Sequence, residues 1–359
     1  MLYNYEFERR IRVGVVGAGE HAYRTILPCL QYLPMELVAI ADENQDVGVA
    51  VARQFGARHF YPNHKAMLAK EQMDAVLLVL DLDEHGRPPY PALADEVMRA
   101  GFHVWLESPP CTSTDEVKEF THASARKRRW VLTCFGKMFA PAYLKVASII
   151  GSPEFGGVSS FSYRFPATLP PVEQRKNKLA MIPFLDFIDG YALLVRLFGE
   201  CDGISYLRSN IGDLVLNIHY GSGVIGTMHL TGAQASTSPL ERLEVVGLGA
   251  NVVVENATRL TYYRAGGDRG LPDEGDRPTT FIGADETAPL IWEPEFTLAE
   301  LYNKQLFLQG YVGSLQHFCD AIFADQPPRQ GNVVDMLHIM MIHDKIRDGK
   351  ERTWLSLYS

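Results

Sequence analysis

A short run of small residues near the N-terminus has the spacing of a phosphate-binding turn. Residues 17–22 read Gly-Ala-Gly-Glu-His-Ala and directly follow the β-branched run IRVGVV. In this spacing the first glycine permits a tight turn, the second lets a pyrophosphate approach the backbone, and the small third residue lets a helix pack on the strand. The phosphates would lie at the helix N-terminus, which favours negative charge. A plain glycine turn is the alternative interpretation.

Asp42 is a carboxylate at about the distance from the turn at which a dinucleotide-binding site has one. Asp42 ends a second apolar run, ELVAIAD, close to the ~20 residues at which a carboxylate binds the ribose hydroxyls of a dinucleotide. The next three residues are Glu, Asn and Gln, and none of them could neutralise a 2′-phosphate. The sequence therefore predicts NAD as the cofactor, with NADP less favoured. The first cofactor-binding candidates are Gly17, Gly19, Glu20, His21, Ala22 and Asp42.

The segments around these residues predict how the chain is organised. Apolar runs such as DAVLLVL and HVWLE alternate with helical patterns up to about residue 134, which indicates a doubly wound parallel sheet. Beyond it, segments such as VSSFSYRF and ERLEVVGLGANVVVEN alternate with period two between glycine turns, which favours a mostly antiparallel sheet. We expect an α/β protein with two domains, residues 1–134 and residues 135–359. Residues 264–290 are expected to form a surface excursion, with a substrate lid as the alternative.

Composition excludes several classes of function. The 359 residues carry a formal net charge of −9, which argues against a nucleic-acid partner. The five cysteines form no CxxC pair and fit free thiols in a reducing cytoplasm. The N-terminus lacks the apolar core of a signal peptide, and no run is long enough to span a membrane. We therefore expect a cytoplasmic protein. No His, Cys or carboxylate cluster has metal-binding spacing, so we also expect no metal.

Taken together, the motifs resemble those of the glucose-fructose oxidoreductase, inositol dehydrogenase and MocA family (Gfo/Idh/MocA). The resemblance rests on GVVGAGEHA, the stretch from DAVLLVL to VWLESPP, FGKMFAPAY, the helix FLDFIDGYALLVRLFGE, and the segments QGYVGSLQHF and VVDMLH. It implies a Rossmann domain followed by an α/β domain with a large open sheet, through which members form oligomers. Here that implies a homo-dimer or homo-tetramer. It also implies hydride transfer between a nicotinamide and a sugar, inositol or related polyol carbon.

The resemblance adds three residues to the predicted cofactor site. His85 matches a histidine that the family often has near the nicotinamide, although a loop histidine is the alternative interpretation. Glu107 and Ser108 end the strand HVWLE and are expected on the cofactor side. Since X-Pro bonds are those in which the cis form costs little, and the family often has one here, we predict a cis bond between Ser108 and Pro109.

The two groups that usually move the proton in this family are missing. The family motif Glu-Lys-Pro reads Glu107-Ser108-Pro109 here, so its lysine is absent. The family histidine, four residues after an aspartate on a helix, is absent under either alignment of FLDFIDGY: one places Asp189 at its position, and the other places Gly190 there.

This loss leaves three interpretations open. The enzyme can use Lys137 with Asp186 or Asp189 as substitute acid/base groups, since general acid/base help is typically worth ~10²–10⁴-fold. It can instead reduce an imine or an activated double bond, for which the nicotinamide supplies most of the chemistry. The third interpretation is a dinucleotide-binding protein without turnover. The first predicts an oxidoreductase acting on a small polar, carbohydrate-like or specialised metabolite.

Overall fold

The computed structural model describes residues 6–264, 288–294, 303–349 and 355–356. The chain divides into two compact units, each assembled from separate stretches of sequence. The first unit comprises residues 1–140, 172–196 and 303–348, and the second comprises residues 141–171, 197–302 and 349–359. Within the described part of the chain, no helix is both long and apolar enough to cross a membrane.

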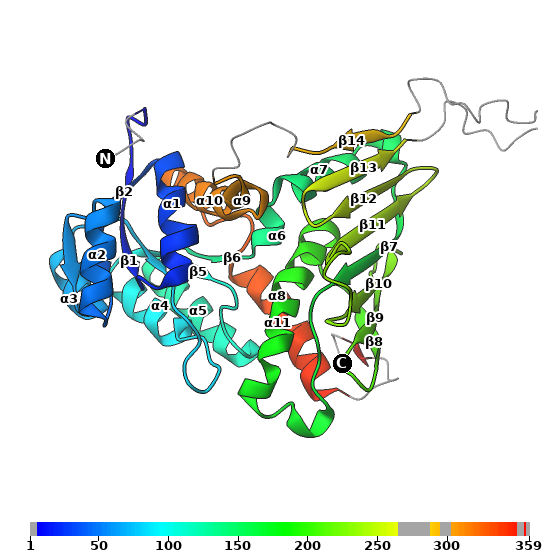
Figure 1. The fold of residues 1–359 in the computed structure, drawn as a ribbon, viewed down its shortest axis with the longest axis horizontal. Helices are drawn as coiled ribbons and strands as arrows, with labels where there is room; N and C mark the ends of the chain where they lie inside the picture. Colours follow the sequence, from blue (N-terminus) through cyan, green and yellow to red (C-terminus); the bar gives the residue numbers. More distant parts are fainter. Residues whose placement is uncertain (1–5, 265–287, 295–302, 350–354, 357–359) are drawn as a thin grey trace, which may run out of the picture. The chain divides into compact units, whose positions relative to one another are not determined.

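A parallel sheet of six strands forms the centre of the first unit (Figure 1). Its order is β3-β2-β1-β4-β5-β6, so the chain starts in the middle and winds outward in both directions. The strands are short and almost wholly apolar because both faces of the sheet are covered, as parallel sheets require. Their bounds are β1 Ile11–Val16, β2 Met35–Ala41, β3 His59–Tyr61, β4 Ala75–Leu78, β5 His103–Glu107 and β6 Val131–Cys134.

Helices cover both faces of this sheet. Figure 1 shows α4 and α5 on one side, with α1 and α10 on the other, and α11 packs against α5. A buried hydrogen bond of 3.0 Å from Trp105 Nε1 on β5 to Ser314 Oγ fastens α10 to the sheet. The helices of this unit are α1 Leu27–Cys29, α2 Gln45–Phe55, α3 His64–Lys70, α4 Tyr90–Arg99, α5 Thr114–Lys127, α6 Gly136–Phe139, α8 Lys178–Phe198, α9 Lys304–Leu308, α10 Tyr311–Ala324 and α11 Val333–Asp348.

Local sequence explains where several of these helices begin and end. Asn44 caps α2 by accepting a hydrogen bond from the Val47 amide at 3.2 Å, and Gly56 ends the same helix with a φ of 75°. The helical segment after the glycine turn is irregular: a π-helix over Ala22–Ile26 leads into α1, and a 3₁₀ turn over Leu30–Tyr32 follows. Pro28 lies at the start of α1, where its missing N–H interrupts the helical bonding.

The second unit is built on an open sheet of nine strands in the order β14-β13-β12-β11-β7-β10-β9-β8-β15. Only β7 and β10 pair in parallel, and the other pairs between described residues are antiparallel. Alternate residues of β9 are buried and exposed, as expected of a sheet with one covered face. The elements are α7 Pro141–Ile150, β7 Val158–Phe165, β8 Gly203–Arg208, β9 Leu214–His219, β10 Ile225–Leu230, β11 Arg242–Gly247, β12 Asn251–Glu255, β13 Arg259–Tyr263, β14 Leu290–Trp292 and β15 Leu355–Ser356, with 3₁₀ turns at Pro153–Phe155 here and Val172–Gln174 in the first unit.

The predicted fold class is confirmed: a doubly wound parallel sheet precedes a large, mostly antiparallel one. The sequence analysis did not identify β3 and β6, which are only three and four residues long. It placed one boundary at residue 134, whereas packing assigns five described helices from later in the chain, α6, α8, α9, α10 and α11, wholly or almost wholly to the first unit. Most of the predicted surface excursion, residues 265–287, lies outside the described residues.

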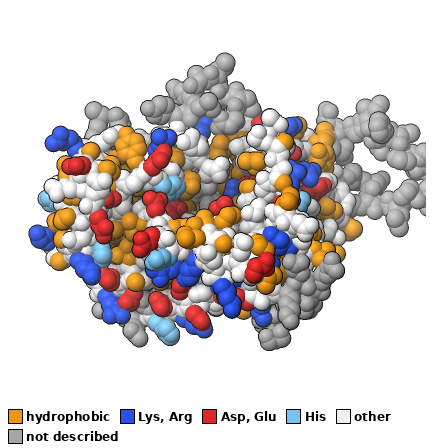
Figure 2. Space-filling view, turned by 60° about the horizontal axis from the view of Figure 1, so that its bottom comes forward, with side chains coloured by type: hydrophobic (Ala, Val, Ile, Leu, Met, Phe, Trp, Pro, Cys, Tyr) orange, Lys and Arg blue, Asp and Glu red, His pale blue; other side chains and the backbone are white. Residues whose placement is uncertain are grey.

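Charged side chains of both signs are intermixed on the surface. On the face that Figure 2 shows, carboxylates alternate with lysines and arginines over the described atoms, and no continuous basic area covers it. Exposed apolar side chains occur among them. This mixture agrees with the acidic balance of the whole sequence, 43 Asp and Glu against 34 Lys and Arg.

Candidate cofactor site

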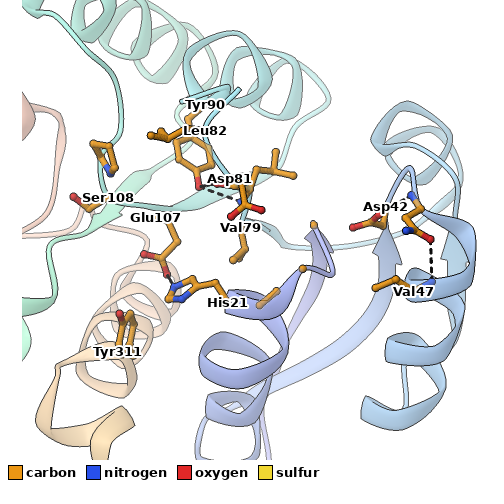
Figure 3. A pocket seen from close by; sticks show the side chains of 16 residues that line it. His21, Asp42, Val47, Val79, Asp81, Leu82, Tyr90, Glu107, Ser108 and Tyr311 are labelled. Atoms are coloured by element: carbon orange, nitrogen blue, oxygen red, sulfur yellow. Dashed lines mark hydrogen bonds and ion pairs between the residues drawn. The ribbon is translucent and has the colours of Figure 1, made fainter. Parts of the chain in front are cut away.

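A pocket of about 550 Å³ opens within the first unit, where the strands of the parallel sheet end (Figure 3). Ligands of doubly wound sheets bind at this edge, at the point where the strand order reverses. A second pocket of about 450 Å³ shares Gly17, Asp42 and Leu80 with it, so the two pockets are adjacent, and together they are called the cofactor hollow. The first pocket is lined by Gly17, Gly19, His21, Ala22, Asp42, Asn44, Val47, Val79, Leu80, Asp81, Leu82, Tyr90, Glu107, Ser108, Pro109 and Tyr311.

The two glycines of the turn are needed for different reasons. Gly17 has a φ of +100°, and a Cβ there would lie 1.9 Å from the carbonyl oxygen of Val79. Any side chain at this position would therefore push apart the ends of β1 and β4. At Gly19 a Cβ would find only Asp81 Oδ2, at 3.9 Å. A side chain there would instead fill the pocket, in the space where the turn approaches a ligand.

Asp42 holds the turn in place with its carboxylate. Its Oδ2 accepts a hydrogen bond of 2.7 Å from the amide of Ala18, and its Oδ1 accepts one of 2.7 Å from the amide of Asn44. Hydrogen bonds to a charged acceptor contribute about 1.5–3 kcal/mol each. One carboxylate thus joins the glycine turn to the start of α2 and faces the space between the two pockets.

His21 and Glu107 form a pair at the other end of the pocket, where Figure 3 shows their side chains pointing toward each other. His21 Nε2 lies 3.1 Å from Glu107 Oε1, and the two side chains are 41% and 11% exposed. The hydrogen bond to Glu107 raises the pKa of His21, burial opposes this, and the charges of Glu107 and Asp81 add to the rise. The pair brings together residues from the first helical turn and the end of β5.

Two tyrosines, the buried Tyr90 and the half-buried Tyr311, complete this end of the pocket. The Tyr90 hydroxyl accepts a hydrogen bond from the Leu80 amide at 3.1 Å and donates one to the Leu80 carbonyl at 2.8 Å, which fixes the chain after β4. Tyr311 begins α10 and packs edge-on against His21, with ring centroids 5.7 Å apart. Burial raises the pKa of Tyr311, and the charges of Glu107 and Asp189 raise it further. Its hydroxyl therefore keeps its proton and can donate a hydrogen bond.

The structure brings most of the predicted cofactor residues to one place. Seven of them line the pocket, and the predicted cis bond between Ser108 and Pro109 is confirmed. Two do not line it: the Glu20 side chain is 76% exposed and pairs with Arg24, and the His85 side chain is 64% exposed beside Glu84. The seven are Gly17, Gly19, His21, Ala22, Asp42, Glu107 and Ser108.

The three predicted acid/base residues do not line this pocket. Lys137 lies on α6, whose first residue packs its backbone against Gly310, immediately before Tyr311. Asp186 is exposed on α8, yet neighbouring groups exclude enough water to raise the pKa of its carboxyl. Asp189 is half-buried on the same helix, and its charge acts on Tyr311.

Sequence reasoning did not identify Tyr90, Tyr311 or Asp81 as site residues. Asp81 and Tyr90 lie in the segment from DAVLLVL to PALADEV, directly after β4 and at the start of α4. Asp81 carried a usable signal, since the residues that follow a central parallel strand face the ligand edge. Tyr311 carried none, because it is the first residue of a helix distant in sequence and reaches the pocket only through the packing of that helix, α10.

Comparison with known proteins agrees with this geometry. Residues 11–135 match the Gfo/Idh/MocA model, described as "Oxidoreductase family, NAD-binding Rossmann fold". Over this segment, about a third of the chain, the protein is similar to the Gfo/Idh/MocA oxidoreductase family. This family consists of NAD(P)-dependent dehydrogenases and reductases. The relatives of this chain include enzymes that act on sugars.

Two curated relatives and one solved structure illustrate the likeness. The dTDP-3,4-didehydro-2,6-dideoxy-alpha-D-glucose 3-reductase of Actinomadura kijaniata is 28% identical over 165 residues, 46% of this chain and 47% of that protein, so the match spans about half of the relative's length. The enzyme of the same name from Streptomyces antibioticus is 29% identical over 91% of this chain and 95% of its own. Levoglucosan dehydrogenase, solved with NADH and levoglucosan, shares the fold with a TM-score of 0.76 at 15% identity, covering 98% of this chain and 100% of that one.

The residues present fit the dinucleotide that this family binds. The Gly17 turn has no room for a side chain, and Gly19 leaves the approach to the backbone open. Asp42 stands at the junction of the two pockets, where a ribose would meet its carboxylate. When bound, the nicotinamide ring would supply the hydride chemistry, and Glu107, Ser108 and Tyr311 would surround that end of the hollow.

Proposed function

We propose that this protein is an NAD-dependent oxidoreductase that transfers hydride between the nicotinamide and a small polar, carbohydrate-like metabolite. The observation that carries the proposal is the pair of adjacent pockets at the sheet edge, with a glycine turn held by Asp42 where they meet and the His21–Glu107 pair at one end. The sugar-modifying relatives support the substrate class.

The charge of the hollow supports NAD over NADP. Neither a lysine nor an arginine occurs among the described residues that line the two pockets. The carboxylates of Asp42 and Glu43 line the second pocket, and its histidine, His64, is already paired with Glu96 at 2.9 Å. A 2′-phosphate beside Asp42 would therefore meet negative charge without a cation to offset it.

Proton transfer in this protein requires groups other than the usual lysine and histidine of the family. Oxidation of a carbinol releases the hydroxyl proton as the hydride leaves, and a positioned base must accept it. We propose Asp189, Asp186 and Lys137 as the acid/base groups, with Asp189 the best supported. Its charge reaches Tyr311, whose protonated hydroxyl lines the pocket beside Glu107. Tyr311 would then orient the substrate oxygen by donating a hydrogen bond.

The test combines cofactor binding with turnover in the purified full chain. NADH and NADPH are titrated separately by calorimetry, and the NADH complex is then mixed with a panel of keto-sugars, aldoses, simple ketones and cyclic imines. We expect tighter binding of NADH than of NADPH and loss of the reduced-nicotinamide absorbance with a sugar carbonyl. If only imines oxidise the bound NADH, the proposed carbohydrate-like substrate is wrong and the protein is an imine reductase. If NADH binds tightly and no compound oxidises it, the protein is a non-catalytic binding protein.

We further propose a cytoplasmic homo-dimer or homo-tetramer that associates through the open sheet of the second unit. Val215, Ile225 and Val246 are 39%, 54% and 36% exposed on β9, β10 and β11 of this sheet, which is the kind of apolar surface that an interface covers. The five cysteines are buried and form no disulfide, which agrees with a reducing compartment. Light scattering of the full chain measures the oligomer, and a monomeric mass at micromolar concentration would contradict the proposed assembly.

A further inference from the structure

The first unit contains a further, separate cavity of about 200 Å³, which shares no lining residue with the two pockets of the cofactor hollow. It lies among the loop after β4, the turn before α5, the start of α8 and the end of α11, all of which belong to that unit. Met181 and Leu185 of α8 provide an apolar wall. The remaining lining is strongly basic, which is unusual in a chain with a net charge of −9.

Four cationic side chains line this small cavity. They are Arg175, Lys176, Lys178 and Arg347, and none of the nine described lining residues is acidic. Arg175 is only 2% exposed, and its Nη1 donates a hydrogen bond of 3.1 Å to the carbonyl of Ile346, so the guanidinium is fixed in position. Of the four, only Arg175 is buried, whereas Lys176 and Lys178 are exposed to solvent.

Two of these cations, Arg347 and Lys178, form ion pairs with carboxylates that do not line the cavity. Arg347 contacts Asp344 Oδ1 at 2.8 Å and Asp348 Oδ2 at 2.6 Å. Lys178 Nζ donates to Thr112 Oγ1 at 3.0 Å and lies 3.8 Å from Glu116 Oε1. These acidic groups fix the positions of Arg347 and Lys178. None of these carboxylates is among the described residues that line the cavity.

A buried histidine supplies a further hydrogen-bonding group without a partner. His343 is 2% exposed and lines the cavity, and its ring stacks on Phe184 with centroids 5.5 Å apart. Its Nδ1 lies 3.4 Å from Asp344 Oδ1, whereas Nε2 has no hydrogen-bond partner among the described residues. Leaving such a buried group unsatisfied costs about 1–3 kcal/mol. A ligand in the cavity would remove this cost.

Asp344 orients the ring of His343. Burial acts against the ionised form of Asp344, but hydrogen bonds from His343 and the Thr114 amide, together with the charge of Arg347, outweigh it and lower the pKa of this carboxyl. An ionised Asp344 accepts from Nδ1–H, which leaves Nε2 as the ring nitrogen that a ligand in the cavity can engage.

We propose that this cavity is a binding site for a phosphate group, which Arg175, Lys176 and His343 contact directly. The cations of Arg175, Lys176 and Lys178 approach the space from the segment at the start of α8, and that of Arg347 approaches from α11. The oxygens of a phosphate can accept from these cations, and a protonated phosphate oxygen can donate to His343 Nε2. A tetrahedral phosphate directs its oxygens toward several sides of the cavity, whereas the two oxygens of a carboxylate lie in one plane. The phosphate is either inorganic phosphate or the phosphoryl group of a small organic monoester. The site stands independently of the proposed hydride transfer.

One loop connects the site with the cofactor hollow. Asp81 and Leu82 line the cofactor pocket, and Gly86 of the same loop lines the basic cavity. Gly86 has a φ of +74°, and a Cβ there would lie 3.2 Å from the carbonyl oxygen of Lys178. The loop therefore packs closely on the backbone of the turn that carries the cations.

The test measures binding of sodium phosphate to the full chain by calorimetry, in a phosphate-free buffer and against sodium chloride at matched ionic strength. Lys176→Met removes an exposed cation from the cavity, His343→Gln removes the buried imidazole, and Lys118→Met is the matched control. Lys118 is an exposed lysine of α5 that pairs with Asp115 and does not line the cavity. Glucose 6-phosphate and unphosphorylated glucose distinguish an organic monoester from inorganic phosphate.

We expect one phosphate per chain, with affinity lowered about tenfold or more by Lys176→Met and His343→Gln and unchanged by Lys118→Met. NADH affinity should stay the same in all three variants, so a failure here is separate from a failure of the proposed function. Tighter binding of glucose 6-phosphate than of phosphate would assign the site to a monoester. Phosphate heats equal to those of chloride, or equal losses in Lys176→Met and Lys118→Met, would overturn the proposal. If His343→Gln does not fold, Lys176→Met decides the test.

Discussion

Replacement of Asp42 by asparagine tests the arrangement on which the cofactor site depends. The wild-type carboxylate accepts hydrogen bonds of 2.7 Å from the amides of Ala18 and Asn44. Asparagine keeps one acceptor oxygen but turns an NH₂ group toward the second amide. One charge-assisted bond is thus lost outright, at about 1.5–3 kcal/mol. At roughly 2–4 °C per kcal/mol, the melting temperature of the apoprotein should fall by several degrees.

The same substitution should change the preference between the two dinucleotides. Loss of a charged acceptor for the ribose weakens NADH binding by about 1.5–3 kcal/mol, which is roughly 10- to 100-fold. For NADPH, removal of the charge also relieves the repulsion between Asp42 and the 2′-phosphate. Two unit charges ~4 Å apart repel each other by about 1 kcal/mol at a dielectric constant of ~80 and by about 4 kcal/mol at ~20. The ratio of NADPH to NADH affinity should therefore rise by about tenfold or more.

Calorimetric titration with both cofactors and a thermal melt of the apoprotein measure these effects. Glu43→Gln is the matched control, because Glu43 is an exposed carboxylate that lines the same second pocket but has no hydrogen bond to the glycine turn among the described contacts. We expect this control to leave the melting temperature nearly unchanged and to shift the cofactor ratio less than Asp42→Asn does. An unchanged ratio in Asp42→Asn, or an equal shift in both variants, would refute the role assigned to Asp42.

Three further predictions concern the turn, the histidine pair and the acid/base groups. Gly17→Ala should abolish NADH binding and, in chemical unfolding, destabilise the fold by more than Gly56→Ala. Both glycines have a positive φ, which costs an alanine about 1–2 kcal/mol. Of the two, only Gly17 would place a Cβ against backbone, at 1.9 Å from the Val79 carbonyl oxygen. Because its glutamate partner raises the pKa of His21 above the unfolded value, this pair contributes stability that is fully present below the unfolded pKa of about 6.5 and is lost as the pH rises through the folded pKa. His21→Gln should therefore lower the free energy of unfolding at about pH 5.5 and change it little at about pH 8.5, and an equal effect at both would contradict this linkage. Asp189→Asn and Lys137→Met should each lower kcat by about 10²–10⁴-fold with NADH affinity unchanged, and a variant that keeps its turnover is thereby removed from the acid/base set.

Much of the fold was predictable because its signals are local. A β-branched run followed by the glycine turn, and Asp42 at the end of the next apolar run, identified the start of the parallel sheet. Period-two alternation identified the strands from β7 to β13. The short strands β3 and β6 were missed, since three or four residues are too few to show a period. The assignment of α8, α10 and α11 to the first unit was not predictable from consecutive sequence, because it depends on which apolar faces pack together.

The sequence by itself determined the turn at Gly17, the carboxylate of Asp42 and the absence of the family lysine at Ser108, because each is a matter of residue type at a fixed spacing. Only the tertiary structure decided which proton-bearing groups share the pocket. The His21–Glu107 pair joins residues 86 positions apart, and Tyr311 reaches them from the far end of the chain. The basic cavity also combines four distant segments. Such juxtapositions result from the packing of helices on a common sheet, and the local periodicity that predicts each element contains no information about its distant neighbours.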